Sequence, residues 1–193
     1  MMLVRFAVVF LILCGLNLRA EEFARYNQVK QYDKHFSKYS KRSFGPAFDW
    51  RHFKAQAVAE SGLRTDARSR VGAVGLMQIM PTTYREIVKR NRHIRGSGKE
   101  PKWSIAAGID YNRSIWLLFK EKRPFQDRLD FMFGAYNAGK GNIFQAQRRA
   151  KKRGLDPNRW RTMESTLPSV TGGHSKETIG YVDKIKKVKR VLN

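Results

Sequence analysis

Residues 125–137 constrain the fold more than any other part of this sequence, because they are apolar on nearly every side of a helix. The apolar positions are Leu129, Phe131, Met132, Phe133 and Ala135. A helix of this kind is stable in water only when other elements bury it on several sides. We therefore predict that 125–137 is the central helix of a globular domain, and that Gly139 and Gly141 end it.

Helical spacing of apolar residues recurs along the chain, and no segment of convincing length alternates as a strand does. A chain of 193 residues with 41% hydrophobic residues can build one packed core. The prediction is an all-α fold in a single globular domain, with at most a small β hairpin near 69–80. The other expected helices cover about 48–61 with a left-handed cap at Gly62, 82–92, 104–123, 142–153 and the segment around 179–188, whereas 155–176 is expected to be irregular.

Residues 1–20 have the layout of a secretory signal peptide, with Arg5 before an apolar run and Ala20 at the end. An uncleaved membrane anchor is the alternative. The apolar run over 6–13 is shorter than the roughly 20 residues that span a bilayer. We expect an exported protein of the periplasm or cell envelope, membrane-associated if the segment is retained.

Cys14 is the only cysteine, and it lies inside this segment. Lipid attachment to it is disfavoured because Leu13 stands where such signals have a small residue. A mature chain would then contain no disulfide, thiol nucleophile or cysteine metal ligand. Residues 21–46 are polar and predict an extended or loosely helical lead-in, so the folded domain is expected to cover 47–193.

The chain is strongly basic, with 39 Lys and Arg against 16 Asp and Glu and a formal charge of +23. Such a charge concentrates polyanions around the protein. Nucleic acid is the commonest partner of this kind, but export argues against it. Acidic wall polymers or an acidic membrane surface fit better, for example through the basic stretch 148–154; the alternative is that the charge only maintains solubility.

Glu60 is the candidate acid for chemistry. It lies in the last turn of the helix that begins near residue 48, beside Ala57 and Val58. Apolar neighbours and the negative end of the helix dipole both favour the protonated carboxyl group. Such a group can protonate a leaving oxygen. A Glu near a helix end is more often a solvated surface residue, so position alone does not identify an active site.

The string that contains Glu60, AESGLRTDARSRVGAVGLMQIMPTTY, resembles the catalytic segment of the soluble lytic transglycosylases, whose catalytic domain has the goose-type, lysozyme-like fold. FGAYNAGKGN resembles the second signature of this family, and KETIGYVDKI resembles the third. The resemblance extends over about 48–188. It implies an enzyme that cuts the β-1,4 bond between N-acetylmuramic acid and N-acetylglucosamine in peptidoglycan and forms a 1,6-anhydromuramic acid end.

The resemblance also implies roles for individual residues. Glu60 would be the acid and then the base, and no metal or cofactor would be needed. Met80 and Tyr181 could equally be core residues, and Glu177 could simply favour a helix start. The residues expected to bind the glycan strand are Ser69, Gly75, Gln78, Met80, Tyr136, Asn137, Glu177 and Tyr181.

Two other functions remain open from the sequence. A hydrolytic muramidase on the same fold would need a second carboxylate, for which Asp66 is the nearest candidate in a polar loop. A non-catalytic adaptor would only bind the wall. We expect a monomer. No metal site is expected, because His52, His93 and His174 are scattered along the sequence and are interpreted as surface residues.

Overall fold

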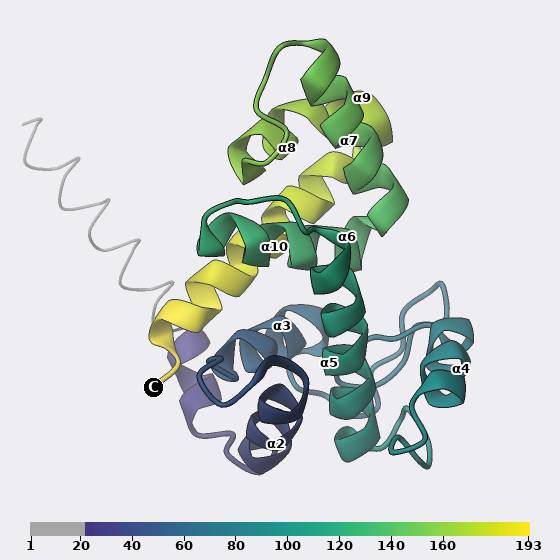
Figure 1. The fold of residues 1–193 in the computed structure, drawn as a ribbon. Coiled ribbons are helices and arrows are strands. Elements are labelled where there is room, and N and C mark those ends of the chain that lie inside the picture. The colour runs from purple at the N-terminus through teal and green to yellow at the C-terminus, as the bar shows by residue number, and fades with distance from the viewer. Residues whose placement is uncertain (1–21) are drawn as a thin grey trace, which may run out of the picture.

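The structure, a computed structural model, describes residues 22–193. The signal peptide expected at 1–20 and Cys14 lie outside this range. Within it, β structure is limited to isolated bridges that join Val74 to Arg68 and to Ile79, so the prediction of a mainly helical fold is confirmed. The elements in Figure 1 are η1 (Arg25–Asn27), α2 (Asp33–Phe44), α3 (Arg51–Ser61), α4 (Pro81–Arg90), α5 (Pro101–Leu118), α6 (Phe125–Ala138), α7 (Lys140–Lys152), α8 (Trp160–Thr166), α9 (Pro168–Thr171) and α10 (His174–Val191).

The helix α6 is the centre of the fold, as its apolar surface predicts. It packs against α5, α7, α8 and α10, and residues 129–135 on it are all buried. The helix α10 runs along the molecule and packs on both α3 and α6 (Figure 1). Its buried stripe consists of Ser175, Thr178, Tyr181, Val182, Ile185 and Val188. Two segments far apart in the sequence, α3 and α10, therefore lie side by side.

The described part of the expected lead-in, residues 22–46, is more ordered than its sequence predicts. Residues 33–44 form the regular helix α2, which packs on α5 and α3. Phe36 on α2 is fully buried in the same core as α5 and α6. Few of the twelve residues of α2 are apolar, so the apolar period is short and several Lys and Arg side chains obscure it. This segment is part of the packed fold.

The prediction of irregular structure over 155–176 is wrong. This stretch contains α8 and α9, and α10 begins within it at His174. Pro168 occupies the first turn of α9, where proline is compatible with a helix. Trp160 is buried against α6, where a Cβ on Gly134 would lie 2.2 Å from the indole. Proline and glycine thus separate short helices here.

Among the other predicted helix ends, some agree with the structure, and those of α5 differ by several residues. Gly62 has φ 63° and ends α3 in a left-handed conformation, so that Glu60 lies in its last turn. Both α4 and α5 begin at a proline, Pro81 and Pro101. The helix α5 already ends at Leu118, ahead of Pro124. Among residues 22–193, no helix combines the length and the apolar character that crossing a membrane requires.

Candidate active site

Glu60 projects from the last turn of α3 into the space between α3, α10 and the loop 63–80. Its side chain is only partly exposed. Burial raises the pKa of Glu60 to about 7, the hydroxyl of Tyr181 and the charge of Lys184 lower it, and the charge of Glu177 raises it. A carboxyl group with this pKa is protonated in part of the molecules at neutral pH, as a general acid requires.

Tyr181 contacts Glu60 directly. Its hydroxyl donates a hydrogen bond to Oε1 of Glu60 with an oxygen–oxygen distance of 2.6 Å. The ring is largely buried on α10, and burial together with the Glu60 charge keeps the pKa of Tyr181 well above its usual value. Tyr181 therefore remains a hydrogen-bond donor over the whole pH range in which Glu60 titrates.

The loop 63–80 is anchored to three helices around Glu60. Ser61 at the end of α3 donates its hydroxyl proton to the carbonyl oxygen of Leu76, 2.9 Å away. The amide of Met77 donates to Ser104 Oγ on α5 at 3.1 Å, and the carbonyl oxygen of Met77 accepts from the Tyr136 hydroxyl on α6 at 2.8 Å. The backbone of residues 76–77 is thereby fixed.

Three of the residues expected to bind glycan also organise this loop. Ser69 Oγ accepts the amide of Ala73 at 3.0 Å and closes the turn 69–73. The Gln78 amide group donates to the carbonyl oxygens of Ala67 and Gly75 at 3.0 and 2.9 Å. The backbone of the loop thus supplies the hydrogen-bond partners that the Gln78 amide needs within its apolar run.

Gly75 has a structural reason to be glycine. Its φ is +74°, and a Cβ would lie 2.6 Å from the carbonyl oxygen of Gly98 and 2.9 Å from Ser104 Oγ. Glycine is required here because the loop backbone packs closely against Gly98 and Ser104 of the same chain. Its expected contact with the glycan remains a prediction.

Met80 ends the loop, and Tyr136 on α6 donates a hydrogen bond to the loop. Met80 is 38% exposed at the start of α4, so it is an accessible apolar side chain and not a core residue. Tyr136 packs edge-on against Tyr111 with ring centroids 5.2 Å apart. Burial and the Glu60 charge both raise the pKa of Tyr136 well above its usual value.

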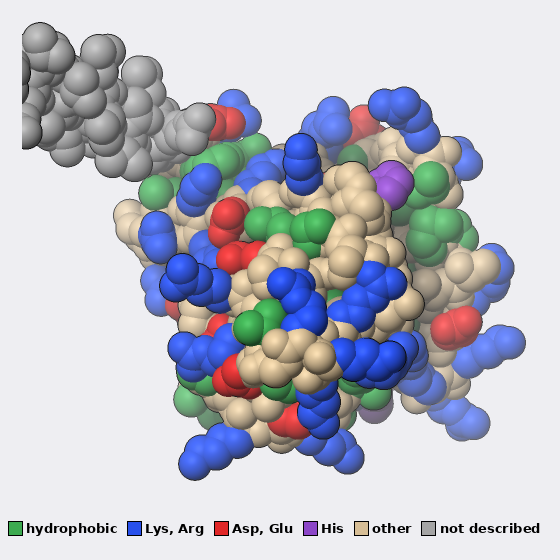
Figure 2. Space-filling model, turned by 90° about the horizontal axis from the view of Figure 1, so that it is seen from above, with side chains coloured by type: hydrophobic (Ala, Val, Ile, Leu, Met, Phe, Trp, Pro, Cys, Tyr) green, Lys and Arg blue, Asp and Glu red, His purple; other side chains and the backbone are tan. Residues whose placement is uncertain are grey.

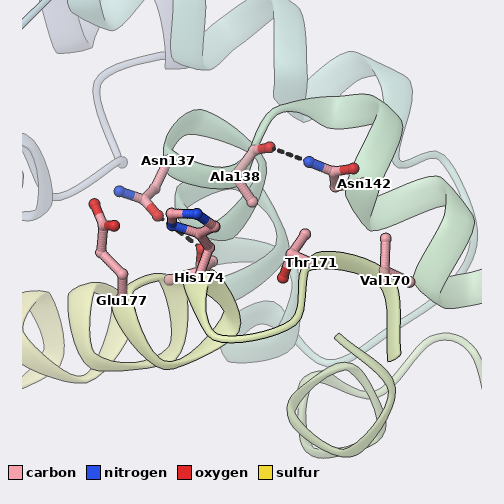
Figure 3. Close-up of a pocket in the computed structure, with 8 residues that line it drawn as sticks. Asn137, Ala138, Asn142, Val170, Thr171, His174 and Glu177 are labelled. Atoms are coloured by element: carbon pink, nitrogen blue, oxygen red, sulfur yellow. Dashed lines mark hydrogen bonds between the residues drawn. The ribbon is translucent and has the colours of Figure 1, made fainter. Parts of the chain in front are cut away.

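Asn137 and Glu177 line a cavity of about 390 Å³ between the ends of α6 and α10 (Figure 3). The Asn137 amide oxygen accepts the hydroxyl of Thr178 at 2.8 Å, which fixes α6 to α10. In Figure 3 the Glu177 carboxylate and the Asn137 amide face each other, with the His174 ring beside them. Glu177 is exposed here, and its charge acts on Glu60 from this side.

The remaining acids and histidines differ in their surroundings. Asp66 is exposed, as expected of a residue in a polar loop. Asp130 is buried on α6, and burial raises its pKa to about 6, although Lys186 on α10 lies 3.2 Å away. Within residues 22–193, no three His, Cys, Asp or Glu side chains gather in a way that could hold a metal ion.

His52 is half-buried and not the exposed surface residue that its sequence context suggests. Its ring packs against those of Phe48 and Phe125, with centroid distances of 5.7 and 6.4 Å. Burial lowers its pKa to about 4, so the ring is neutral at physiological pH. His93 and His174 are exposed, as predicted.

Two buried amides behind Tyr181 were missed by sequence reasoning. Gln56 Nε2 donates to the Tyr181 hydroxyl oxygen at 3.1 Å, and Asn112 Nδ2 donates to Gln56 Oε1 at 2.6 Å. Both side chains are fully buried. Asn112 is a lone amide among apolar residues on its face of α5, and this is the one signal that could have identified it, because a buried amide needs partners; Gln56 lies among polar and apolar residues on α3 and gave no such signal.

Comparison with known proteins agrees with this geometry. The family model described as the transglycosylase SLT domain matches residues 38–158. A 70 kDa soluble lytic transglycosylase from Escherichia coli superimposes with a TM-score of 0.65 and 27% identity, covering 84% of this chain and 24% of that one. The same fold is seen in a 70 kDa soluble lytic transglycosylase in complex with bulgecin A, also with a TM-score of 0.65.

Curated relatives carry consistent names. The membrane-bound lytic murein transglycosylase F of Shewanella pealeana is 30% identical over 172 residues, covering 83% of this chain and 34% of that protein. The protein of the same name from Pseudomonas fluorescens is 32% identical over 166 residues, covering 84% and 32%. This chain thus spans about a third of the length of these relatives. The match over 38–158 shows that the chain belongs to the transglycosylase SLT domain family.

Proposed function

We propose that this protein is a lytic transglycosylase that cleaves the glycan strands of peptidoglycan, with Glu60 as its acid and base. The observation that carries the proposal is the Glu60 carboxyl group, with a pKa of about 7 and a 2.6 Å hydrogen bond from Tyr181. The names of the relatives, lytic murein transglycosylases, support the same substrate.

The reaction follows from one carboxyl group used twice. Protonated Glu60 gives its proton to the glycosidic oxygen between N-acetylmuramic acid and N-acetylglucosamine as that bond breaks. The N-acetyl group of the muramic acid stabilises the positive charge that develops at its C1. The Glu60 carboxylate then takes the proton of the C6 hydroxyl of the same sugar. The C6 oxygen bonds to C1, leaving a 1,6-anhydro ring and a protonated Glu60 ready for the next cycle.

The surroundings of Glu60 favour this route over hydrolysis. The usual hydrolytic mechanisms use a second carboxylate, about 5–10 Å from the first, to form a covalent intermediate or to activate water. Asp66, the candidate from the sequence, is exposed in the loop. Glu177 is also exposed, and its charge favours the protonated form of Glu60.

The glycan strand would lie across Glu60 between two walls. The loop wall would contain Ser69, Gly75, Gln78 and Met80; Gly75 is buried within it, and Met80 offers an exposed apolar contact for a sugar face. The opposite wall presents Tyr136, Asn137, Glu177 and Tyr181. The cavity of about 390 Å³ beside Asn137 and Glu177 supports a sugar site on this second wall (Figure 3).

The basic surface fits a protein that works on the anionic cell wall. Lys and Arg side chains are spread over the face shown in Figure 2 and outnumber acidic ones there. The end of α7 contributes Arg148, Lys151, Lys152 and Arg153, which are exposed. Export to the envelope, action as a monomer without cofactor, and contact with acidic wall polymers or a membrane surface belong to this proposal.

Digestion of purified sacculi, with mass spectrometry of the products, tests the function. We expect fragments that end in 1,6-anhydromuramic acid from the wild type and none from Glu60→Gln. Glu164→Gln, the same change on α8, is the matched control and should retain activity. Reducing muramic acid ends would instead indicate a hydrolytic muramidase, and binding to sacculi without cleavage would indicate an adaptor.

A further inference from the structure

Glu60 stands at the end of a chain of four side chains that begins on α5. Asn112 donates to Gln56 Oε1 at 2.6 Å, Gln56 donates to the Tyr181 oxygen at 3.1 Å, and Tyr181 donates to Glu60 Oε1 at 2.6 Å. Asn112 also donates to the carbonyl oxygen of Gly108, one turn earlier on α5, at 2.9 Å. The chain links α5, α3 and α10.

The direction of every bond in this chain follows from the backbone of α5. The Gly108 carbonyl oxygen can only accept, so the Asn112 atom that faces it must be the amino nitrogen Nδ2. The second proton of Nδ2 then points at Gln56, whose facing atom must be the oxygen Oε1. Gln56 therefore presents its amino group to Tyr181. The oxygen of Tyr181 accepts that bond, and its single proton is directed to Glu60.

We propose that Gln56 and Asn112 are positioning residues for Glu60, which act by fixing Tyr181 as a permanent donor to Oε1. This inference rests on the proposed function for its catalytic consequence. Because Oε1 accepts from Tyr181 in both protonation states, the transferable proton is held on Oε2. Glu60 can thus change from acid to base without a change in the orientation of its carboxyl group.

Stability does not explain the two amides. Burying an amide costs free energy unless all its polar atoms find partners. Asn112 Oδ1 is buried and has no hydrogen-bond partner among residues 22–193. Apolar side chains of similar size at both positions would avoid this cost. A network that is incompletely satisfied is better explained by its effect on Tyr181 and Glu60.

Substitution of Gln56 by methionine tests the proposal with little change in side-chain volume. Gln56→Met removes the donor to Tyr181, so the hydroxyl is no longer held toward Glu60 and the carboxylate is less stabilised. Losing a hydrogen bond to a charged group should lower kcat roughly 10-fold with little change in KM. The same loss should raise the pKa of Glu60 by about one unit. The alkaline limb of the pH–rate profile should move to higher pH.

A double-mutant cycle separates positioning from a general packing role. In a Tyr181→Phe background, Gln56→Met should cause no further loss of kcat, because the residue through which it acts is already without its hydroxyl. Additive losses would overturn the proposal. Gln147→Met is the matched control: Gln147 on α7 donates to the carbonyl oxygen of Pro157 at 3.0 Å, and its loss should leave the pH profile of the wild type.

Titration of the Glu60 carboxyl carbon by ¹³C NMR gives a readout that needs no activity, with the signal assigned by its absence in Glu60→Gln. Asn112→Leu, which removes the donor to Gln56, should shift the pKa in the same direction and by less, and it replaces Gln56→Met if that variant does not fold. An unshifted pKa would overturn the positioning role, even in an active enzyme. If the pKa of Glu60 shifts in these variants but the wild type releases no anhydro product, the positioning role holds and the proposed function is wrong.

Discussion

The hydroxyl of Tyr136 on α6 donates to the carbonyl oxygen of Met77 over 2.8 Å, so the loop beside Glu60 is joined to the central helix by one side chain. Met77 is fully buried. Its side chain packs on α5, where a Cβ on Gly108 would lie 2.7 Å from the Met77 methyl group. The position of the loop relative to Glu60 therefore depends on contacts with both α5 and α6.

Tyr136→Phe should loosen this loop while the aromatic ring stays in place. The buried carbonyl oxygen of Met77 loses its partner, which should lower the free energy of unfolding by about 1–2 kcal/mol. Activity on sacculi should fall as well, because the loop supports the wall of the proposed cleft. Urea unfolding and product release measure the two effects.

Tyr84→Phe is the matched control for this change. The Tyr84 hydroxyl donates to the carbonyl oxygen of Gly96 at 3.2 Å in an exposed position. Loss of an exposed hydrogen bond should cost less than about 0.5 kcal/mol. If Tyr136→Phe behaves like Tyr84→Phe in both assays, the bond to Met77 does not hold the loop.

Glu60→Gln should stabilise the protein at alkaline pH but not at acid pH. Burial raises the pKa of Glu60 in the folded chain to about 7 from its ordinary value of 4.5. The folded state then holds a proton that the unfolded state releases, so the wild type loses stability as pH rises from about 4.5 to 7. With a discount for partial exposure, this loss is on the order of 2 kcal/mol, and glutamine does not incur it.

The measurement is the unfolding free energy of both proteins at pH 4 and pH 8. The stability of Glu60→Gln relative to the wild type should be higher at pH 8. A difference that does not change with pH would mean that the Glu60 pKa is not raised. Glu164→Gln controls for the loss of one negative charge from a strongly basic protein.

Sequence reasoning predicted those parts of the structure in which the signal is local. The all-round apolar pattern of 125–137 identified the buried helix α6, and Gly62 identified the end of α3. The segment KETIGYVDKI, through its resemblance to the third family signature, led to Tyr181, which contacts Glu60 in the structure. In these cases, the predictive pattern is formed by residues that are close together in the sequence.

Relationships between distant segments were not visible in this way. Gln56 and Asn112 are 56 residues apart, and each by itself is one amide on a helix. In α2, the apolar residues are few and several basic residues lie among them, which weakened the helical period. The prolines and glycines over 155–176 indicated breaks, but the local pattern did not reveal the short helices α8 and α9, which are held by distant contacts such as the packing of Trp160 against Gly134.

Gly75→Ala should destabilise the protein because the loop 63–80 cannot accommodate a Cβ there. The residue has φ +74°, and the added atom would lie 2.6 Å from the carbonyl oxygen of Gly98. Strain and overpacking together should cost about 2–4 kcal/mol. Thermal unfolding measures this loss. Gly141→Ala is the matched control: no atom lies within 4 Å of its Cβ position in α7, so this variant should be as stable as the wild type or slightly more. Equal behaviour of the two variants would contradict the close approach.

Phe36→Ala tests whether α2 belongs to the same cooperative unit as the rest of the domain. Phe36 is fully buried in the common core, so the cavity left by alanine should cost about 3–4 kcal/mol in unfolding free energy. The loss should be seen equally by far-UV circular dichroism and by tryptophan fluorescence, because one transition unfolds α2 with α3 and α5.

Phe125→Ala is the control for the loss of an aromatic ring. Phe125 is 57% exposed at the start of α6, so its truncation should cost much less than that of Phe36.

If Phe36→Ala leaves the main transition unchanged, residues 22–45 are a separable lead-in, as their polar sequence first indicates. If it lowers the midpoint of the whole transition, removal of this segment should also abolish cleavage of sacculi, because α2 supports both α3, which carries Glu60, and α5, which carries Asn112.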